Sequence, residues 1–395
     1  MEKSKKRGQN EGSIRQRPDG TWEARCCTGR NPNGTLLKRV SFYGKTRQEV
    51  SKKMNETLMT IQNNTYIVPS KLTLSSWLDT WLWDYKKPSV KGKTFEGYEN
   101  IVRNHLKPML GQYSIQELRP DLVQKLYNEK AKTLSPRMVE LIHITLHAAL
   151  KQAAKLGYIY KNVTESTNLP AKQKKHARAL TVDEQNRFIA ALKSNRLRTA
   201  FLFTLFTGLR VGELAGLRWL DINFENKFFS ISQIVTRIKN FEPEIKTKTV
   251  LTFGTPKSQE SNRVIPLFDE LISLLKKHKE EQDIEKQQAG EAYKDIDLVF
   301  CSQFGYPFDP RQIDVYFKKA IHEACLQDVT IHTLRHTFAT RSIESGVELK
   351  VLQELLGHSS ITVTADIYSH VLLPKKREAM NKLREVFNNI DMEQT

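Results

Sequence analysis

The sequence has 395 residues, with 62 Lys or Arg against 44 Asp or Glu, so its formal net charge is +18 and its isoelectric point is near 9.6. This length predicts two or three domains, and the positive charge predicts a polyanionic partner, either nucleic acid or an anionic membrane surface. No apolar run approaches the roughly eighteen residues of a membrane span, and the basic N-terminus lacks the apolar stretch of a secretory signal.

Residues 1–69 are predicted to form a small basic module of three strands and one helix. Asp-Gly and Asn-Gly turn signals separate three β-rich runs at 13–17, 21–28 and 36–43. Thr46 is placed to cap a helix that ends near Ile61. A basic face on such a sheet can grip DNA, although a solvated β-module without a partner is the alternative. The candidate contacts are Arg15, Arg17, Arg25, Arg30, Lys38 and Arg39.

The four cysteines include no Cys-x-x-Cys pair. Neighbouring residues on a strand point to opposite faces, which argues against a metal shared by Cys26 and Cys27. We therefore expect Cys26, Cys27, Cys301 and Cys325 to be reduced thiols, as in a cytoplasmic protein.

Residues 70–169 are predicted to form a domain of four helices, because apolar side chains recur there at helical spacing. The aromatic side chains are expected to form the core rather than to stack on bases. Residues 170–178 follow as a basic linker, either a solvated tether or a strap along the DNA backbone. The predicted helices cover 74–85, 94–106, a stretch that begins at Pro120, and 136–156. The candidate contacts of the linker are Lys172, Lys174, Lys175 and Arg178.

Residues 179–395 are predicted to form a mainly α domain with a small antiparallel sheet, so the whole chain is of the multidomain α+β class. Thr207-Gly208 is a turn that presents Arg210 at the start of a helix. Lys257 is expected near a hairpin between the last two of three strands, and 236–248 as a long loop. The predicted strands cover 227–235, 249–255 and 263–266, and a charged, solvated helix covers 276–294.

The C-terminal stretch carries residues suited to phosphate chemistry. His332 and Arg335 share one helix face, His358 follows a glycine, and Tyr368 comes ten residues later. Arg binds phosphate oxygens through a planar fork, His moves protons, and Tyr supplies a nucleophilic oxygen. A single Tyr or His is more often structural, so the joint pattern carries the prediction.

This half of the chain resembles the catalytic domain of the tyrosine recombinases. The family's set is Arg, Lys, His-x-x-Arg, His or Trp, and Tyr, in that order, and the chain has a match at every position. The flanking residues Thr207–Leu214 and Arg263–Leu267 also resemble the family. The matching residues are Arg210, Lys257, His332, Arg335, His358 and Tyr368.

The resemblance implies that Tyr368 attacks a DNA phosphodiester and forms a 3′-phosphotyrosyl intermediate. Arg210 and Arg335 would hold the two non-bridging oxygens and offset the added negative charge. His332 would orient the phosphate or help to take the proton, His358 would hydrogen-bond the phosphate, and Lys257 would protonate the departing 5′ oxygen. A covalent ester conserves the bond energy, so neither ATP nor a metal is expected, and no Walker loop or magnesium-type carboxylate cluster is present in the sequence.

Three further residues of this domain carry expectations. Glu213, three positions after Arg210, is expected to orient an active-site side chain rather than to be an ordinary surface acid. His336 and His370 are expected to be structural. An amphipathic helix from Met380 to Ile390 would either fold back or dock in a neighbouring protomer, and the resemblance favours the exchange between protomers.

The N-terminal module resembles the arm-binding domain of phage and conjugative-transposon integrases, and the helical domain resembles their core-binding domain. The expected partners are double-stranded DNA at core and arm sites, a homotetramer on DNA, and an excision factor. We expect a site-specific integrase that inserts and excises a mobile element. The alternatives are a non-catalytic DNA-binding regulator, a simpler recombinase that resolves chromosomes or plasmids, and a type IB topoisomerase, which the His358 motif and the N-terminal module fit less well.

Overall fold

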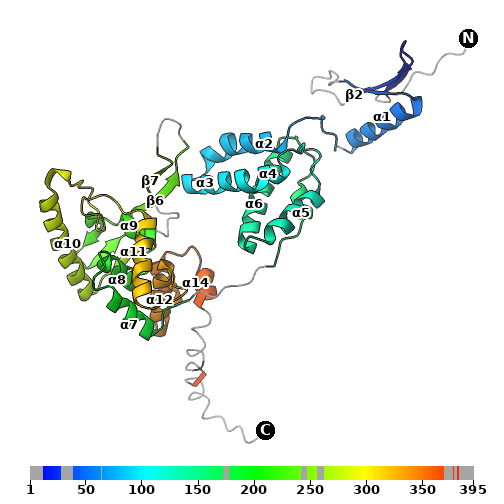
Figure 1. The fold of residues 1–395 in the computed structure, drawn as a ribbon. Helices are drawn as coiled ribbons and strands as arrows, with labels where there is room; N and C mark the ends of the chain where they lie inside the picture. The colour runs from blue at the N-terminus through cyan, green and yellow to red at the C-terminus, as the bar shows by residue number, and fades with distance from the viewer. Residues whose placement is uncertain are drawn as a thin grey trace, which may run out of the picture. The chain divides into compact units, whose positions relative to one another are not determined.

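The computed structural model describes residues 12–27, 39–63, 65–171, 178–241, 247–255, 262–368, 377 and 380–381. The chain divides into two compact units, Met1–Lys172 and Gln173–Thr395. Along the chain, Figure 1 shows a small sheet with one helix, then a group of helices, then a larger part that mixes helices with short strands. In the described part of the chain, no helix is long and apolar enough to span a bilayer.

The N-terminal module consists of one antiparallel sheet, in the order β1-β2-β3, and one helix. Ala24 and Cys26 on β2 are buried against Val50 and Met54 of the helix, so the helix covers one face of the sheet. The predicted strands and helix are confirmed, while Arg30 and Lys38 lie outside the described residues. The elements are β1 (Ser13–Gln16), β2 (Trp22–Cys27), β3 (Arg39–Gly44) and α1 (Arg47–Gln62).

The helical part is built around buried aromatic side chains, as predicted. The Trp77 indole N–H donates to the carbonyl of Ala149 at 3.0 Å and joins the first helix to the last. Each of the first two predicted helices contains a π-helical turn, and the second runs past its predicted end near Leu106 because α4 continues it to Leu110. The elements are α2 (Leu74–Thr80), η1 (Trp81–Lys86), η2 (Lys87–Ser89), α3 (Gly92–Ile101), η3 (Val102–Leu106), α4 (Lys107–Leu110), α5 (Pro120–Ala131), α6 (Pro136–Lys155) and η4 (Val163–Ser166).

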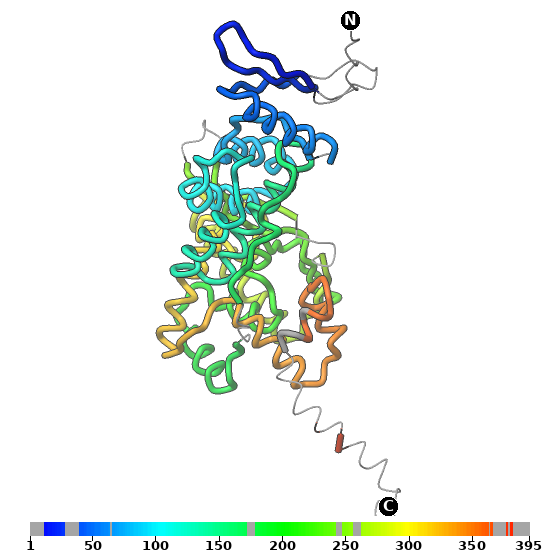
Figure 2. The backbone as a smooth tube through the Cα atoms, turned by 90° about the vertical axis from the view of Figure 1, so that its right-hand side faces the viewer, coloured from blue at the N-terminus to red at the C-terminus, as the bar shows by residue number. Residues whose placement is uncertain are grey.

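Helices of the second unit surround the buried helix α8. Helix α12 packs along α8, and Figures 1 and 2 show the two side by side. The charged helix α10 starts earlier than predicted, at Asp269. The helices are α7 (Val182–Ala191), α8 (Arg198–Thr207), α9 (Val211–Gly216), η5 (Trp219–Asp221), α10 (Asp269–Ala289), η7 (Gly290–Ala292), α11 (Pro310–Glu323), α12 (Ile331–Glu344), α13 (Leu349–Leu356) and α14 (Ile361–Tyr368).

The strands of this unit form two small antiparallel sheets, one of three strands in the order β4-β5-β8 and one of two, β6-β7. The predicted hairpin between the last two strands is therefore wrong, because β7 pairs with β6 and β8 pairs with β5. The run predicted as one strand is split where the Gln233 side chain donates to the Gly216 carbonyl at 3.0 Å. The strands are β4 (Ile222–Asn223), β5 (Phe228–Ser230), β6 (Ile234–Lys239), β7 (Thr249–Gly254) and β8 (Val264–Pro266).

Candidate active site

The turn after α8 places Arg210 at the start of α9. Gly208 ends α8 in the left-handed region, with φ +67°, and redirects the chain. Glu213, in the first turn of α9, accepts hydrogen bonds from the Arg210 backbone N–H at 3.0 Å and from its Nη1 at 2.8 Å. The Arg210 side chain remains 37% exposed, so part of its guanidinium faces solvent.

Arg335 comes to the same place from α12 and is only 1% exposed. Its Nη1 donates to the carbonyl of Gly208 at 2.8 Å, and its Nη2 donates to the carbonyl of Leu356 at 2.6 Å. Arg210 Nη2 donates to the next carbonyl along the chain, that of Gly357, at 3.1 Å. The two guanidinium groups are therefore held by successive carbonyls of one chain segment.

Two histidines lie beside these arginines. Burial, followed by the charges of Arg335 and Arg210, lowers the pKa of His332, which precedes Arg335 by one helical turn. The same causes lower the pKa of His358 to about 4, and His358 Nδ1 lies 2.9 Å from the hydroxyl of Thr364. Both imidazoles are therefore neutral near pH 7 and can accept a proton or share a hydrogen bond with a phosphate.

Helix α14 brings Tyr368 into this part of the fold. The helix packs against α13 and ends at Tyr368, and Thr364 within it is fully buried against His358. The Tyr368 side chain and the whole of Lys257 lie outside the described residues. The structure thus brings together four of the six predicted catalytic side chains and the helix that carries a fifth.

Sequence reasoning gave Arg263 no role of its own, because it treated the residue as the start of a strand and as part of a flanking stretch. The side chain is 6% exposed, and its two Nη atoms donate to the Glu213 carboxylate at 3.3 and 3.0 Å. Burial alone would raise the pKa of Glu213, but Arg263 and Arg210 outweigh burial and lower it, so the carboxylate is ionised. The partners of Arg263 lie 50 and 92 positions away in sequence, so no local spacing could indicate them.

His336 lies on the same helix as His332, with ring centroids 4.6 Å apart. Burial lowers its pKa to about 4, and His332 and then Arg335 contribute further. His370 lies outside the described residues. The structural role expected for both histidines stays a prediction.

The face of the N-terminal sheet opposite α1 carries a second group of predicted residues. Glu23 is 1% exposed on this face and bonds Arg15 Nε at 2.7 Å and Arg25 Nη2 at 2.8 Å. Arg17 lies over the ring of Tyr43, 5.4 Å from its centroid, and Arg39 is exposed at the start of β3. The sheet thus holds a cationic surface whose arginines are organised by one carboxylate.

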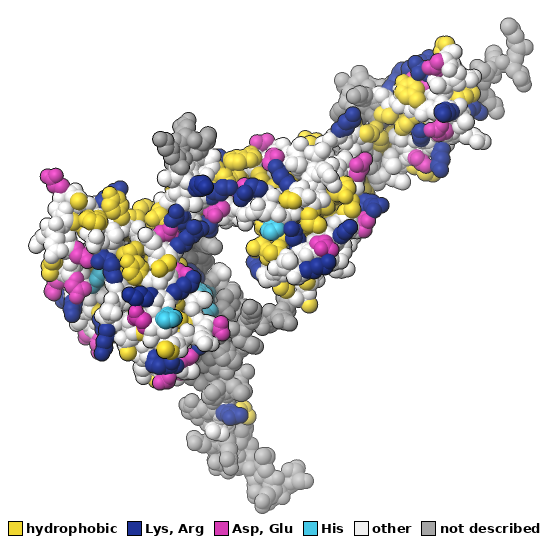
Figure 3. Space-filling model, in the orientation of Figure 1, with side chains coloured by type: hydrophobic (Ala, Val, Ile, Leu, Met, Phe, Trp, Pro, Cys, Tyr) yellow, Lys and Arg dark blue, Asp and Glu magenta, His cyan; other side chains and the backbone are white. Residues whose placement is uncertain are grey.

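The linker is described only at its end. Arg178 pairs with Glu184 at 2.5 Å and donates to the Gln327 carbonyl, so this side chain is bound within the second unit. Lys172, Lys174 and Lys175 lie outside the described residues. In the helical part, Figure 3 shows Lys and Arg side chains on the surface, and the exposed residues of η2 and the start of α3 include Lys87, Lys91 and Lys93.

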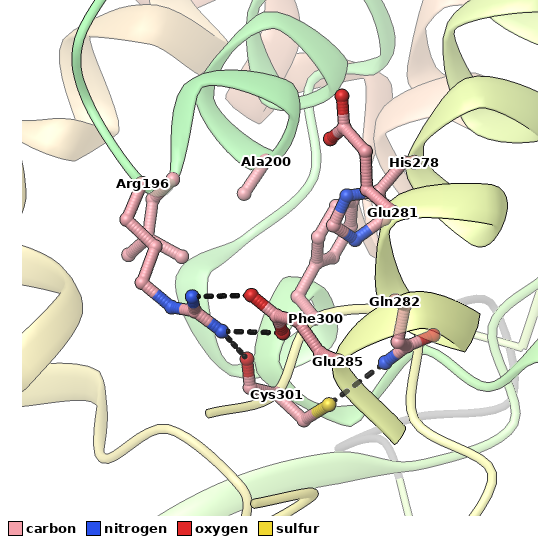
Figure 4. A pocket seen from close by; sticks show the side chains of 9 residues that line it. Arg196, Ala200, His278, Glu281, Gln282, Glu285, Phe300 and Cys301 are labelled. Atoms are coloured by element: carbon pink, nitrogen blue, oxygen red, sulfur yellow. Dashed lines mark hydrogen bonds and ion pairs between the residues drawn. The ribbon is translucent and has the colours of Figure 1, made fainter. Parts of the chain in front are cut away.

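A polar pocket between α8 and α10 contains none of the predicted site residues (Figure 4). Arg196 makes a two-pronged ion pair with Glu285, at 2.7 and 2.9 Å, and Gln282 donates to Cys301 Sγ at 2.8 Å. These groups satisfy one another, so we assign the pocket a structural role. In the described ranges, no group of three or more His, Cys, Asp or Glu side chains could hold a metal.

Comparisons with known proteins agree on one family. The model of the phage integrase family matches residues 178–373, and that of the phage integrase N-terminal SAM-like domain matches residues 73–131. A protein described as "Tyrosine recombinase XerC-like" from Caldanaerobacter subterraneus subsp. tengcongensis is 32% identical over 370 residues, which are 91% of this chain and 94% of the relative.

Solved structures show the same fold. The Tn1549 transposon integrase in complex with a circular intermediate DNA has a TM-score of 0.66 and 22% identity, covering 79% of this chain and 100% of that one. A lambda integrase tetramer bound to a Holliday junction has a TM-score of 0.57 and 22% identity, covering 92% of this chain and 96% of that one.

Proposed function

Because this chain belongs to the phage integrase family of tyrosine recombinases, we propose that it is a site-specific integrase that cleaves and rejoins DNA through Tyr368. The observation that carries the proposal is the pair of guanidinium groups on adjacent carbonyls, with Arg335 on Leu356 and Arg210 on Gly357. Two planar forks held by successive carbonyls can bind both non-bridging oxygens of one phosphodiester.

The proposed chemistry follows from charge. Attack by the Tyr368 oxygen adds negative charge to the phosphate in the transition state, and two fixed cations stabilise that charge more than they stabilise the ground state. A neutral His332 can take the tyrosine proton, and His358 can share a hydrogen bond with the phosphate. Lys257 supplies the proton to the departing 5′ oxygen, and Glu213 orients Arg210. These roles rest on the residues present and on the family pattern.

The other parts of the chain are assigned to binding different DNA sites. We propose that residues 1–69 bind arm-type DNA through the sheet face with Arg15, Arg17 and Arg25. Residues 70–169 bind the core site, and 170–178 link them to the catalytic residues 179–395. From the resemblance we also propose a homotetramer on DNA, exchange of the C-terminal helix between protomers, an excision factor and a cytoplasmic location. The structural neighbours are integrases bound to DNA, one of them as a tetramer, and this supports the proposed assembly.

A covalent trap tests the proposal. The full-length protein is incubated with core-site DNA that carries a nick near the cleavage position, so that the released fragment diffuses away and the adduct accumulates. The wild type should form a covalent protein–DNA complex, while Tyr368→Phe should bind the same DNA and form none. An adduct with the Phe variant would move the nucleophile elsewhere. Binding by the wild type without any adduct would favour a non-catalytic regulator.

A further inference from the structure

Three arginines hold three consecutive carbonyls at the end of α13. Arg263 Nε donates to Leu355 at 2.6 Å, Arg335 Nη2 to Leu356 at 2.6 Å, and Arg210 Nη2 to Gly357 at 3.1 Å. The last carbonyls of a helix lack partners within the helix and carry partial negative charge, so three cations stabilise this end strongly. His358 is the next residue, so the three hydrogen bonds also fix the backbone from which its ring projects.

Arg263 differs from Arg210 in how much of its side chain is exposed. Its side chain is 6% exposed, compared with 37% for Arg210. Its Nε donates to the Leu355 carbonyl, and its two Nη atoms donate to the two oxygens of the buried Glu213 carboxylate. All three of its nitrogens donate to Leu355 and Glu213, and Glu213 also holds Arg210, so the effect of Arg263 on chemistry passes through the residues that it holds.

Glu213 is the second residue through which Arg263 can act. The carboxylate is 4% exposed and lies between Arg263 and Arg210, which are the charged groups that act on it most. A buried carboxylate needs such partners to remain ionised. Arg263 therefore keeps Glu213 charged, and the charged Glu213 holds both the backbone N–H and Nη1 of Arg210.

We infer that Arg263 is a positioning residue for strand cleavage, which orients Arg210 through Glu213 and places His358 through the Leu355 carbonyl. The inference rests on the proposed function, because it assigns Arg263 to the same reaction. A lysine at this position would keep the charge but not the fork that serves two carboxylate oxygens and a carbonyl together. Charge alone is thus insufficient.

The test compares Arg263→Gln and Arg263→Lys with Arg196→Gln. Arg196 is a matched control, because it also makes a two-pronged pair with a glutamate and reaches the Cys301 carbonyl, at 3.5 Å, within the same unit. Single-turnover cleavage of nicked core-site DNA is measured at saturating protein, together with core-site affinity and the thermal unfolding midpoint. Cleavage by both Arg263 variants should fall about 100-fold, as expected when a reacting group is misplaced by about 1 Å, while affinity stays near that of the wild type.

A pH profile separates positioning from loss of structure. Without Arg263, burial should raise the pKa of Glu213 toward neutrality, so cleavage by Arg263→Gln should fall further between pH 8 and pH 6. Adding Glu213→Gln should remove this extra pH dependence and leave cleavage slow. Arg196→Gln should lower the unfolding midpoint with no change in cleavage rate or pH profile.

Two outcomes would overturn different claims. The positioning role would be overturned if the wild type cleaves and the Arg263 variants cleave equally well. It would also be overturned if these variants lose cleavage, affinity and thermal stability together. In both cases the proposed function would remain intact. A wild type that forms no Tyr368-dependent adduct would overturn the proposed function and this inference with it.

Discussion

Arg335 donates to the backbone carbonyl of Gly208 at 2.8 Å, across 127 positions of sequence. This hydrogen bond joins α12, which carries His332, to the turn that presents Arg210. Two features of this turn require glycine at position 208. Its φ of +67° is costly for other residues, and a Cβ there would lie 2.7 Å from Phe338 Cδ1 and 3.0 Å from Leu356 Cδ2.

Gly208→Ala should therefore destabilise the second unit by about 2–4 kcal/mol, as the sum of left-handed strain and overpacking. It should also lower cleavage, because Arg210 and Arg335 both depend on this turn. Urea unfolding of the full-length protein would measure the first effect and the nicked-substrate trap the second. Gly254→Ala is the control, since a Cβ there meets no atom within 4 Å and φ is not positive. Equal stability of the two variants would contradict the argument.

Local signals predicted most of the helices but not the strand pairing. Thr46 caps α1 by accepting from the Glu49 N–H, as predicted. The partner of β8 is β5, more than thirty positions earlier, and nothing in either short strand specifies that choice. Residue types and order pointed to Arg210, Arg335 and His358, which the fold brings close to one chain segment, whereas Arg263 was missed because its contacts reach across the folded unit.

Arg210→Lys should reduce cleavage far more than core-site affinity. The lysine keeps one positive charge beside Glu213 but loses the fork that reaches Gly357 and the phosphate. Loss of one such donor costs about 100- to 1000-fold in rate. Single-turnover cleavage and filter binding measure the two quantities, with the exposed Arg198→Lys on α8 as control. Equal losses of rate and affinity would make Arg210 a binding residue only.

Lys257→Ala should be inactive on ordinary DNA and active on DNA with a sulfur at the bridging 5′ position. A thiolate leaves without a proton, so the general acid proposed for Lys257 becomes unnecessary. The comparison needs both substrates with the wild type and with Tyr368→Phe, which should cleave neither. If the sulfur substrate restores no activity to Lys257→Ala, the proton comes from another group.

Stability should fall as the pH drops from about 6.5 toward 4. His336 and His358 have folded-state pKa values of about 4, against 6.5 as the ordinary value. As the pH falls, the unfolded chain therefore takes up protons before the folded protein does. The contribution of the two histidines to stability is complete above pH 6.5 and is lost as the pH falls. Acidic groups whose pKa is lowered in the folded protein, such as Glu184 with an ordinary value of 4.5, change the stability only at lower pH.

Urea midpoints of the full-length protein between pH 7.5 and pH 5 would measure this loss. His336→Gln should flatten the dependence, because it removes one of the buried imidazoles. The exposed His322→Gln on α11 should leave the dependence unchanged. A midpoint that is constant across this range in the wild type would contradict the assigned pKa directions.

Glu23→Gln should weaken the selectivity of the N-terminal sheet for its DNA site without weakening binding itself. The hydrogen bond from Arg15 lowers the pKa of Glu23, so the buried residue is ionised and holds Arg15 and Arg25 in fixed geometry. Direct readout of a base needs a guanidinium held at one angle, whereas attraction to phosphate needs only its charge. The variant gains one positive charge but loses the orientation.

The measurement is the ratio of affinities of the full-length protein for arm-site and scrambled duplexes across a salt series, after footprinting has located the arm site. The ratio should fall about tenfold, which corresponds to one well-oriented base contact, while affinity for scrambled DNA is maintained. Glu56→Gln is the control, because it changes net charge equally from an exposed position on α1. If both variants show the wild-type ratio, Glu23 stabilises the sheet and does not set its specificity. The arm site would then be read through the shape of the DNA or through other side chains of the module.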